Sequence, residues 1–94
     1  MNDAFDEKPK RTKADDRRDL IAAGCAEAMR TRQGRAFVGE VLRLGGLLNM
    51  TFDASPLRMA HSEGRRSLAH DVLIMARSHA SDQLPALIRE TYEE

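Results

Sequence analysis

Three histidines are the residues most suited to holding a metal ion or moving a proton. His61, His70 and His79 follow one another at intervals of nine residues. On a helix of 3.6 residues per turn this interval places successive side chains on opposite faces, and the first and third lie about 27 Å apart. They cannot share one metal ion. Because there is one cysteine and no H-x-x-x-H or C-x-x-C motif, the sequence predicts no metal site and no cofactor.

Ser67, His70 and Asp71 have the side chains of a hydrolytic triad. Ser67 can reach His70 at i, i+3 on a helix. Asp71, however, follows His70 directly and points about 100° away, so it cannot readily orient the imidazole. Cys25 is interpreted as a small core residue rather than a nucleophile. No glycine-rich phosphate loop is apparent, and the sequence predicts that the protein is not an enzyme.

Charge and composition limit the classes of partner. The 94 residues include 15 basic and 15 acidic side chains, which give a formal net charge of zero. Duplex DNA is bound mainly through a basic surface, so a simple DNA-binding role is not favoured. The single cysteine fits a reducing compartment. No apolar run is long enough to span a membrane and the N-terminal residues contain no hydrophobic signal segment, so we expect no membrane anchor and no secretion by a signal peptide.

Residues 1–14 are predicted to form an extended arm. They alternate in charge, contain Pro9, and have Phe5 as their one large apolar side chain. This segment buries too little to offset its ordering entropy, so we expect it to be flexible in isolation or held by a partner, with Phe5 as its anchor. Residues 15–94 are predicted to form a single helical domain.

The spacing of apolar residues predicts an all-α fold, a small bundle of three to four helices. The first helix should run from Asp15 or Asp16 to Arg30, and the second should follow a break at 31–34 and weaken at 45–46. Ser55 and Pro56 provide an N-cap and a first helical residue for a long helix that ends near residue 80. A fourth helix should begin near 81–82.

The middle of the long helix contains an unusual sequence, Glu63, Gly64, Arg65 and Arg66. Gly64 falls on a predicted apolar stripe whose other members are Leu57, Ala60, Leu68, either Val72 or Met75, and Ala76. A glycine within a helix costs about 1 kcal/mol relative to alanine. We therefore predict that another backbone passes close to Gly64, most simply at a helix crossing inside the domain.

The loop before the long helix contains Phe52, which is interpreted as a plug into the core or a contact for a partner. Two helices joined by this loop could imitate a helix-turn-helix motif, whose arginines would contact phosphates. The loop at 49–55 is longer than the usual turn, and Glu63 and Asp71 interrupt the basic surface of the third helix. DNA binding is therefore kept as an alternative.

Four short motifs together resemble the Bbp19-like phage domain family over residues 30–75. They are the run from Gln33 to Phe37, the pattern L-x-x-G-G-L at 42–47, the pair Thr51-Phe52, and the pattern A-x-x-E-G-R-R-S-L at 60–68. The signature positions are Gly34, Arg35, Phe52, Glu63, Gly64, Arg65 and Arg66.

This resemblance implies a protein of the tailed-phage morphogenesis cluster and assigns no catalytic residue. The expected function is that of a non-enzymatic component of the virion or of its assembly, acting through protein–protein contacts at the portal or tail region or inside the particle. Its expected partners are phage structural proteins of the portal, tail or capsid, or a second copy of itself, in the virion or the host cytoplasm. A DNA-packaging accessory and a regulator that binds a host protein are the alternatives. Arg35, Glu63, Arg65 and Arg66 are expected to fix the corner between the second and third helices.

Overall fold

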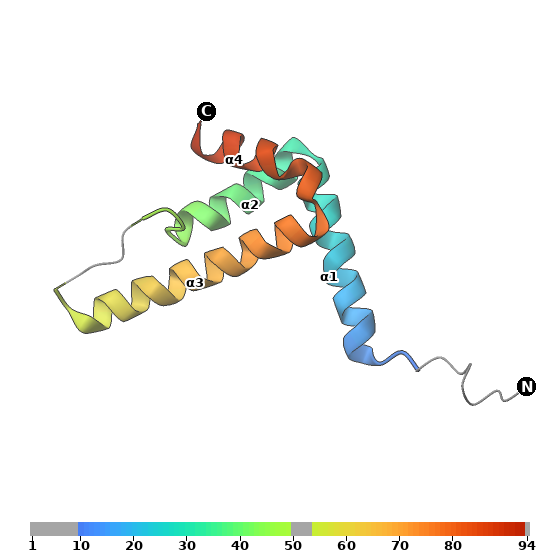
Figure 1. The fold of residues 1–94 in the computed structure, drawn as a ribbon, viewed down its shortest axis with the longest axis horizontal. Coiled ribbons are helices and arrows are strands. Elements are labelled where there is room, and N and C mark those ends of the chain that lie inside the picture. The colour runs from blue at the N-terminus through green and yellow to red at the C-terminus, as the bar shows by residue number, and fades with distance from the viewer. Residues whose placement is uncertain (1–9, 50–53, 94) are drawn as a thin grey trace, which may run out of the picture.

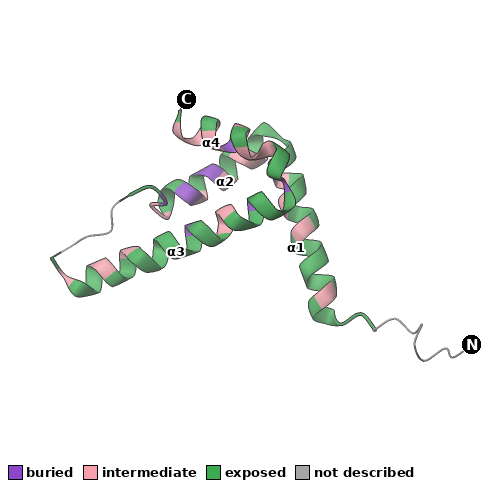
Figure 2. Cartoon of the chain, in the orientation of Figure 1, coloured by how far each residue is buried: buried purple, intermediate pink, exposed green. Residues whose placement is uncertain are grey.

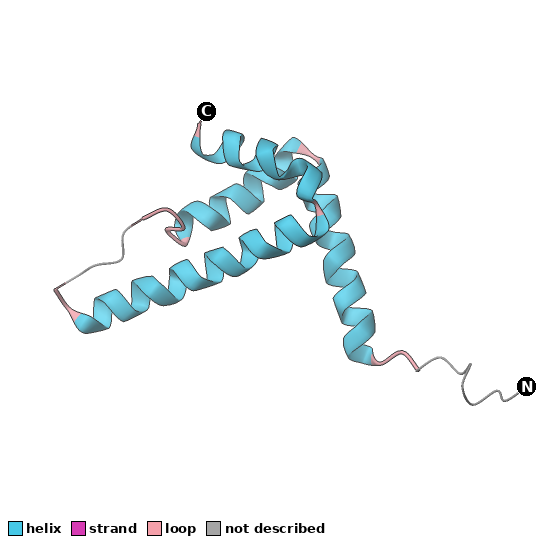
Figure 3. Cartoon of the chain, viewed as in Figure 1, coloured by secondary structure: helices cyan, strands magenta, loops and turns pink. Residues whose placement is uncertain are grey.

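The computed structural model describes residues 10–49 and 54–93, and within these ranges the secondary structure is helical (Figures 1 and 3). The elements are α1 (Lys13–Arg30), α2 (Arg32–Leu44), α3 (Pro56–His79), the 3-10 turn η2 (Ser81–Gln83) and α4 (Leu84–Tyr92). The all-α prediction is confirmed. The arm residues 1–9 and the predicted plug Phe52 lie outside the described ranges, so the arm and its anchor Phe5 stay predictions.

Threonine side chains begin the first two helices. Thr12 Oγ1 accepts a hydrogen bond from the backbone N–H of Asp15, and the Asp15 carboxylate accepts one from the N–H of Thr12, each at 3.1 Å. This capping box starts α1 two residues before the predicted Asp15, and the T-x-x-D pattern at 12–15 was the overlooked signal. Thr31 alone separates α1 from α2, and its Oγ1 accepts from the N–H of Gly34 at 3.0 Å.

A glycine pair ends α2 as predicted, through a Schellman motif. Gly46 has a φ of +69°, its N–H donates to the carbonyl of Arg43 at 3.0 Å, and the N–H of Leu47 donates to the carbonyl of Leu42 at 3.2 Å. A glycine tolerates this left-handed conformation without the steric cost of a Cβ. The chain therefore turns sharply out of α2 toward α3.

The predicted start of α3 is confirmed. Ser55 Oγ accepts from the N–H of Arg58 at 3.4 Å, and Pro56 occupies the first turn, where its missing N–H has no partner to lose. The helix ends at His79, close to the predicted residue 80. The predicted fourth helix begins with η2, after which α4 carries Pro85 in its first turn.

The core lies where the C-terminal end of α1 meets α2, the second half of α3, and α4 (Figures 1 and 2). Met29, Leu42 and Leu87 are fully buried there. Helix α2 runs antiparallel beside α3, and α4 packs along α2 (Figure 1). Figure 2 shows that the first half of α1 and the first half of α3 extend beyond this core with mostly exposed residues.

The prediction for the buried face of α3 was wrong. Ala76, the last member of the predicted stripe, is buried as expected. However, Leu57 and Leu68 of the predicted stripe are exposed by 84% and 63%, whereas Ala69, which lies outside that stripe, is buried. The reason is the short distance between the helices: a Cβ built on Gly45 of α2 would lie 2.5 Å from the Cβ of Ala69. Only a small side chain fits between helices this close, so Ala69 faces α2 while Leu68 lies on the exposed side of α3.

Candidate interaction surface

Arg35 joins four segments of the chain near the start of α2. Its guanidinium donates to both carboxylate oxygens of Glu90, at 2.8 and 3.0 Å, and so ties α2 to α4. It also donates to the backbone carbonyl of Met29 at 3.0 Å and to the side-chain oxygen of Gln83 at 3.3 Å. Arg35 thus lies at the opposite end of α2 from the corner to which the sequence assigned it, and that assignment was wrong.

The Arg35–Glu90 pair is largely shielded from water. The two side chains are 12% and 15% exposed, and the planar guanidinium meets the carboxylate through two parallel hydrogen bonds. These hydrogen bonds lower the pKa of the Glu90 carboxyl below its ordinary value and raise the pKa of Arg35. With its other donors also engaged, Arg35 holds the fold together and is not presented to a ligand.

Arg65 and Arg66 do fix the corner between α2 and α3, as predicted. Arg65 donates to the carbonyl of Leu44, the last residue of α2, and Arg66 donates to the carbonyl of Leu47 at 3.1 Å. A helix leaves its final carbonyls without partners inside the helix, so Arg65 completes the end of α2, while Arg66 holds the turn that follows it. Glu63, the fourth predicted member of the set, is exposed and lines a hollow with Arg66 and His70.

Gly64 is exposed, and the predicted crossing inside the domain is wrong. Beyond the backbone of its own helix and its two chain neighbours, a Cβ built on Gly64 would have no atom of residues 10–49 or 54–93 within 4 Å. The glycines at close approaches are Gly34 and Gly45, together with Gly39, whose Cβ would meet Thr91. Sequence reasoning missed Gly39 because its partner lies on α4.

Replacing Gly64 with alanine should raise the free energy of unfolding of the dilute, monomeric chain by about 1 kcal/mol, because alanine loses less backbone entropy in a helix and its methyl group meets no described atom outside its own helix. Urea unfolding followed by far-UV circular dichroism measures the change. G45A is the matched control: its methyl would press on Ala69 and on the carbonyl of Arg65 3.0 Å away, so it should destabilise the fold. A G64A variant less stable than the wild type would contradict the open surroundings of this glycine.

The exposed side of α3 has a regular pattern, which we name the outer stripe. Its members alternate at intervals of four and three residues, and every one is exposed. They are Leu57, His61, Gly64, Leu68, Asp71 and Met75. Such spacing is the a/d repeat with which a helix packs against another helix. No described part of this chain covers the stripe, although it spans about 27 Å of α3.

Helix α2 adds apolar side chains on the same side. Phe37 is 72% exposed and lies two turns before the exposed Leu44, so both point in similar directions. Leu44 and Val41 line a hollow of about 400 Å³ with Leu68 of the outer stripe. The hollow places the α2 side chains and the outer stripe on one surface. Monomeric soluble proteins rarely expose a continuous apolar surface of this kind without a binding function.

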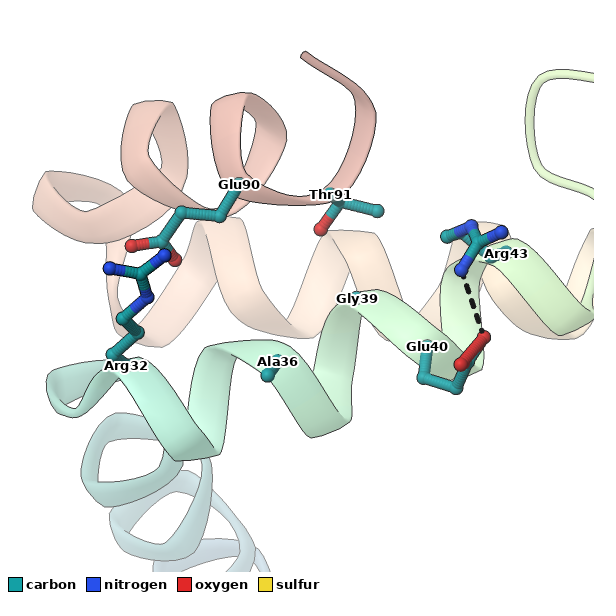
Figure 4. A pocket seen from close by; sticks show the side chains of 7 residues that line it. All are labelled: Arg32, Ala36, Gly39, Glu40, Arg43, Glu90 and Thr91. Carbon is teal, nitrogen blue, oxygen red and sulfur yellow. Dashed lines mark hydrogen bonds and ion pairs between the residues drawn. The ribbon is translucent and has the colours of Figure 1, made fainter. Parts of the chain in front are cut away.

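The hollow between α2 and α4 is poorly suited to a small ligand. It measures about 200 Å³, below the usual range for ligand pockets, and its lining has two arginines and two glutamates. Figure 4 shows Arg32 beside Glu90 at one end and the ion pair between Arg43 and Glu40 at the other. The charges in this hollow balance, so it offers no preference for an anion or a cation.

The one thiol of the chain, Cys25, is partly buried in α1. Burial raises the pKa of the Cys25 thiol, which disfavours the reactive thiolate. Cys25 packs against the core, as the sequence suggested. Among residues 10–49 and 54–93, no cluster of three histidine, cysteine or acidic side chains could hold a metal ion. In the same ranges no helix is both long and apolar enough to cross a membrane.

Comparison with known proteins gives the family. No curated protein and no solved structure matches the chain. A family model described as Bbp19-like phage protein matches residues 25–89, which is more than half of the chain and more than the 30–75 expected from the motifs. The matched segment runs from the C-terminal part of α1 into α4 and contains Arg35 and the complete outer stripe. The chain therefore belongs to the Bbp19-like phage protein family.

Proposed function

We propose that this phage protein is a non-enzymatic component of the tailed-phage particle or of its assembly, and that it acts by binding other proteins. The observation that carries the proposal is the amount of exposed apolar surface. Nine large apolar side chains of the described residues are at least 38% exposed. They are Leu20, Ile21, Phe37, Leu44, Leu48, Leu57, Leu68, Ile74 and Met75.

A protein contact explains this surface better than binding to DNA. Nucleic acid is held by clustered cations, and the chain has a formal net charge of zero. Three arginines of the family signature also have partners within the chain: Arg35 binds Glu90, while Arg65 and Arg66 bind backbone carbonyls. Large apolar side chains are instead the groups that protein interfaces bury.

Quantitative mass spectrometry of gradient-purified phage particles tests the proposal. Peptides of this chain should be present in a fixed ratio to those of the portal and the major capsid protein. A copy number near that of the portal would indicate the head–tail connector or the tail, and hundreds of copies would indicate the capsid. Absence from finished particles and from assembly intermediates would contradict the proposal and lead to tests of DNA and host proteins.

A further inference from the structure

We propose that the outer stripe of α3 binds the outer stripe of a second copy of this chain. The two α3 helices would run antiparallel about a twofold axis at the height of Arg66. This proposal deepens the proposed function and rests on it, because it assigns part of the exposed apolar surface to one particular partner. The spacing of the stripe, its symmetry, its glycine and its area each favour this pairing.

The spacing is that of a helix-packing seam. The six residues of the outer stripe alternate at intervals of four and three residues, which stay close to one helical turn and keep them on one side of α3 for its whole exposed length. Most of this length has no neighbour within the described chain, because the core is built around the second half of α3. The natural partner for such a seam is another long helix with the same repeat.

The order of the residues is self-complementary in the antiparallel direction. An antiparallel pair with its axis at Arg66 brings together residues that are equally far from position 66. Leu57 then meets Met75 of the second copy, so two apolar side chains face each other at each end. His61 meets Asp71 of the second copy, where an imidazole N–H can donate to the carboxylate.

At the centre, Gly64 meets Leu68 of the second copy. Beyond the backbone of its own helix and its two chain neighbours, no atom of the described residues lies within 4 Å of a Cβ at this glycine, and the leucine supplies a side chain to fill the space. This arrangement accounts for a glycine in the exposed interior of a helix, where it costs stability in the isolated chain. The hollow lined by Leu44, Arg65 and Leu68 lies at the same height as the axis.

The available area is sufficient for a stable dimer. A large side chain has roughly 200 Å² of surface. The exposed parts of the apolar side chains of the stripe and of α2 therefore provide on the order of 600 Å² per copy. The side chains counted are Leu57, Leu68 and Met75 of the stripe, and Phe37 and Leu44 of α2. A standard interface buries about 800 Å² per partner, and about 65% of it is apolar in homodimers. The zero net charge of the chain also allows two copies to approach without long-range repulsion.

Sedimentation equilibrium of the full chain tests the proposal. We expect a reversible dimer with twice the chain mass of 10.5 kDa. L68E should raise the dimer dissociation constant at least about tenfold, because it places a charge in the centre of the interface. G64L should do the same although leucine is the better helix former. L20E is the matched control, since Leu20 is 75% exposed on α1 and should leave the dimer unchanged.

A charge exchange tests the antiparallel register. H61D alone places two carboxylates opposite each other, and D71H alone places two imidazoles opposite each other, so each should weaken the dimer. The double variant H61D/D71H restores an imidazole opposite a carboxylate at both sites and should recover most of the lost affinity. Independent effects that simply add in the double variant would overturn the pairing.

The outcomes separate this inference from the proposed function. A chain that stays monomeric up to about millimolar concentration, or a dimer that L68E and L20E weaken equally, overturns the second copy as the occupant of the outer stripe. The proposed function would survive that result if the chain is found in phage particles. A dimer sensitive to L68E in a chain absent from particles and assembly intermediates would support the pairing and contradict the proposed function.

Discussion

Replacing Gly34 with alanine should cost most of the stability of the fold, on the order of 3 kcal/mol or more. Gly34 lies in the first turn of α2, where the chain has just left α1 at Thr31. A Cβ at this position would overlap the carbonyl oxygen of Ala28 and lie 2.6 Å from the carbonyl carbon. Both atoms belong to the backbone of α1, so no side-chain rotation relieves the overlap. The two helices would have to separate at the core.

Urea unfolding of G34A beside G24A measures this effect with a matched control. Gly24 lies in the middle of α1, and a Cβ there would have no atom within 4 Å outside the helix's own neighbouring backbone. G24A should therefore gain about 1 kcal/mol from helix propensity, as G64A should. Equal stabilities of G34A and G24A would contradict the close approach of α1 and α2.

Replacing Arg35 with alanine should lower the melting temperature markedly more than replacing Arg43. Arg35 forms a shielded bidentate pair with Glu90, and its removal leaves that carboxylate poorly solvated beside α2. Arg43 forms an exposed pair with Glu40 at 3.5 Å, which water largely replaces. Thermal unfolding of R35A and R43A measures the difference. Similar melting temperatures would mean that the junction contributes no more than a surface ion pair.

The same pair gives stability a dependence on acid pH. Hydrogen bonds from Arg35 lower the folded-state pKa of Glu90 below the ordinary 4.5. This contribution is complete above the ordinary pKa and is lost as the pH falls through the lower folded-state value. The stability of the wild type relative to E90Q should therefore be constant near neutrality and decline in acid, starting below about pH 4.5. A difference between the two proteins that does not vary with pH would contradict this coupling.

Local signals in the sequence were sufficient to place the helices. Ser55 with Pro56 predicted the start of α3, and the glycines at 45–46 predicted the end of α2, because caps depend on a few neighbouring residues. The start of α1 was missed by two residues. Its T-x-x-D capping box differs from the more familiar pattern with glutamate, although the hydrogen bonds are the same.

The orientation of α3 and the partner of Arg35 could not be predicted in the same way. Apolar side chains occur on more than one side of α3, and the distance to α2 decides which side is buried. That distance is set by Gly45 against Ala69, a contact between residues on different helices. Likewise, Arg35 binds a carboxylate 55 positions away. These contacts depend on the assembled fold, whereas the rule for apolar periodicity considers each helix alone.

The burial of alanines in place of leucines is also what connects the fold to the proposed function. Because α2 and α3 approach closely at Ala69, Leu68 remains outside, where it joins Leu57 and Met75 in the outer stripe. The surface that the sequence suggested as core is thus available for binding. Most of the side of α3 that was predicted to be buried is therefore a candidate interface.

Incorporation of variants into phage particles is the most direct test of binding through this surface. During infection by the phage, the host would supply equal amounts of isotope-labelled wild-type chain and of L68E, and mass spectrometry of purified particles would give their ratio. We expect L68E to be depleted about tenfold or more relative to the wild type. A23E, which changes an exposed residue of α1 outside the nine apolar side chains, should be incorporated normally. Equal incorporation of L68E and the wild type would contradict the account.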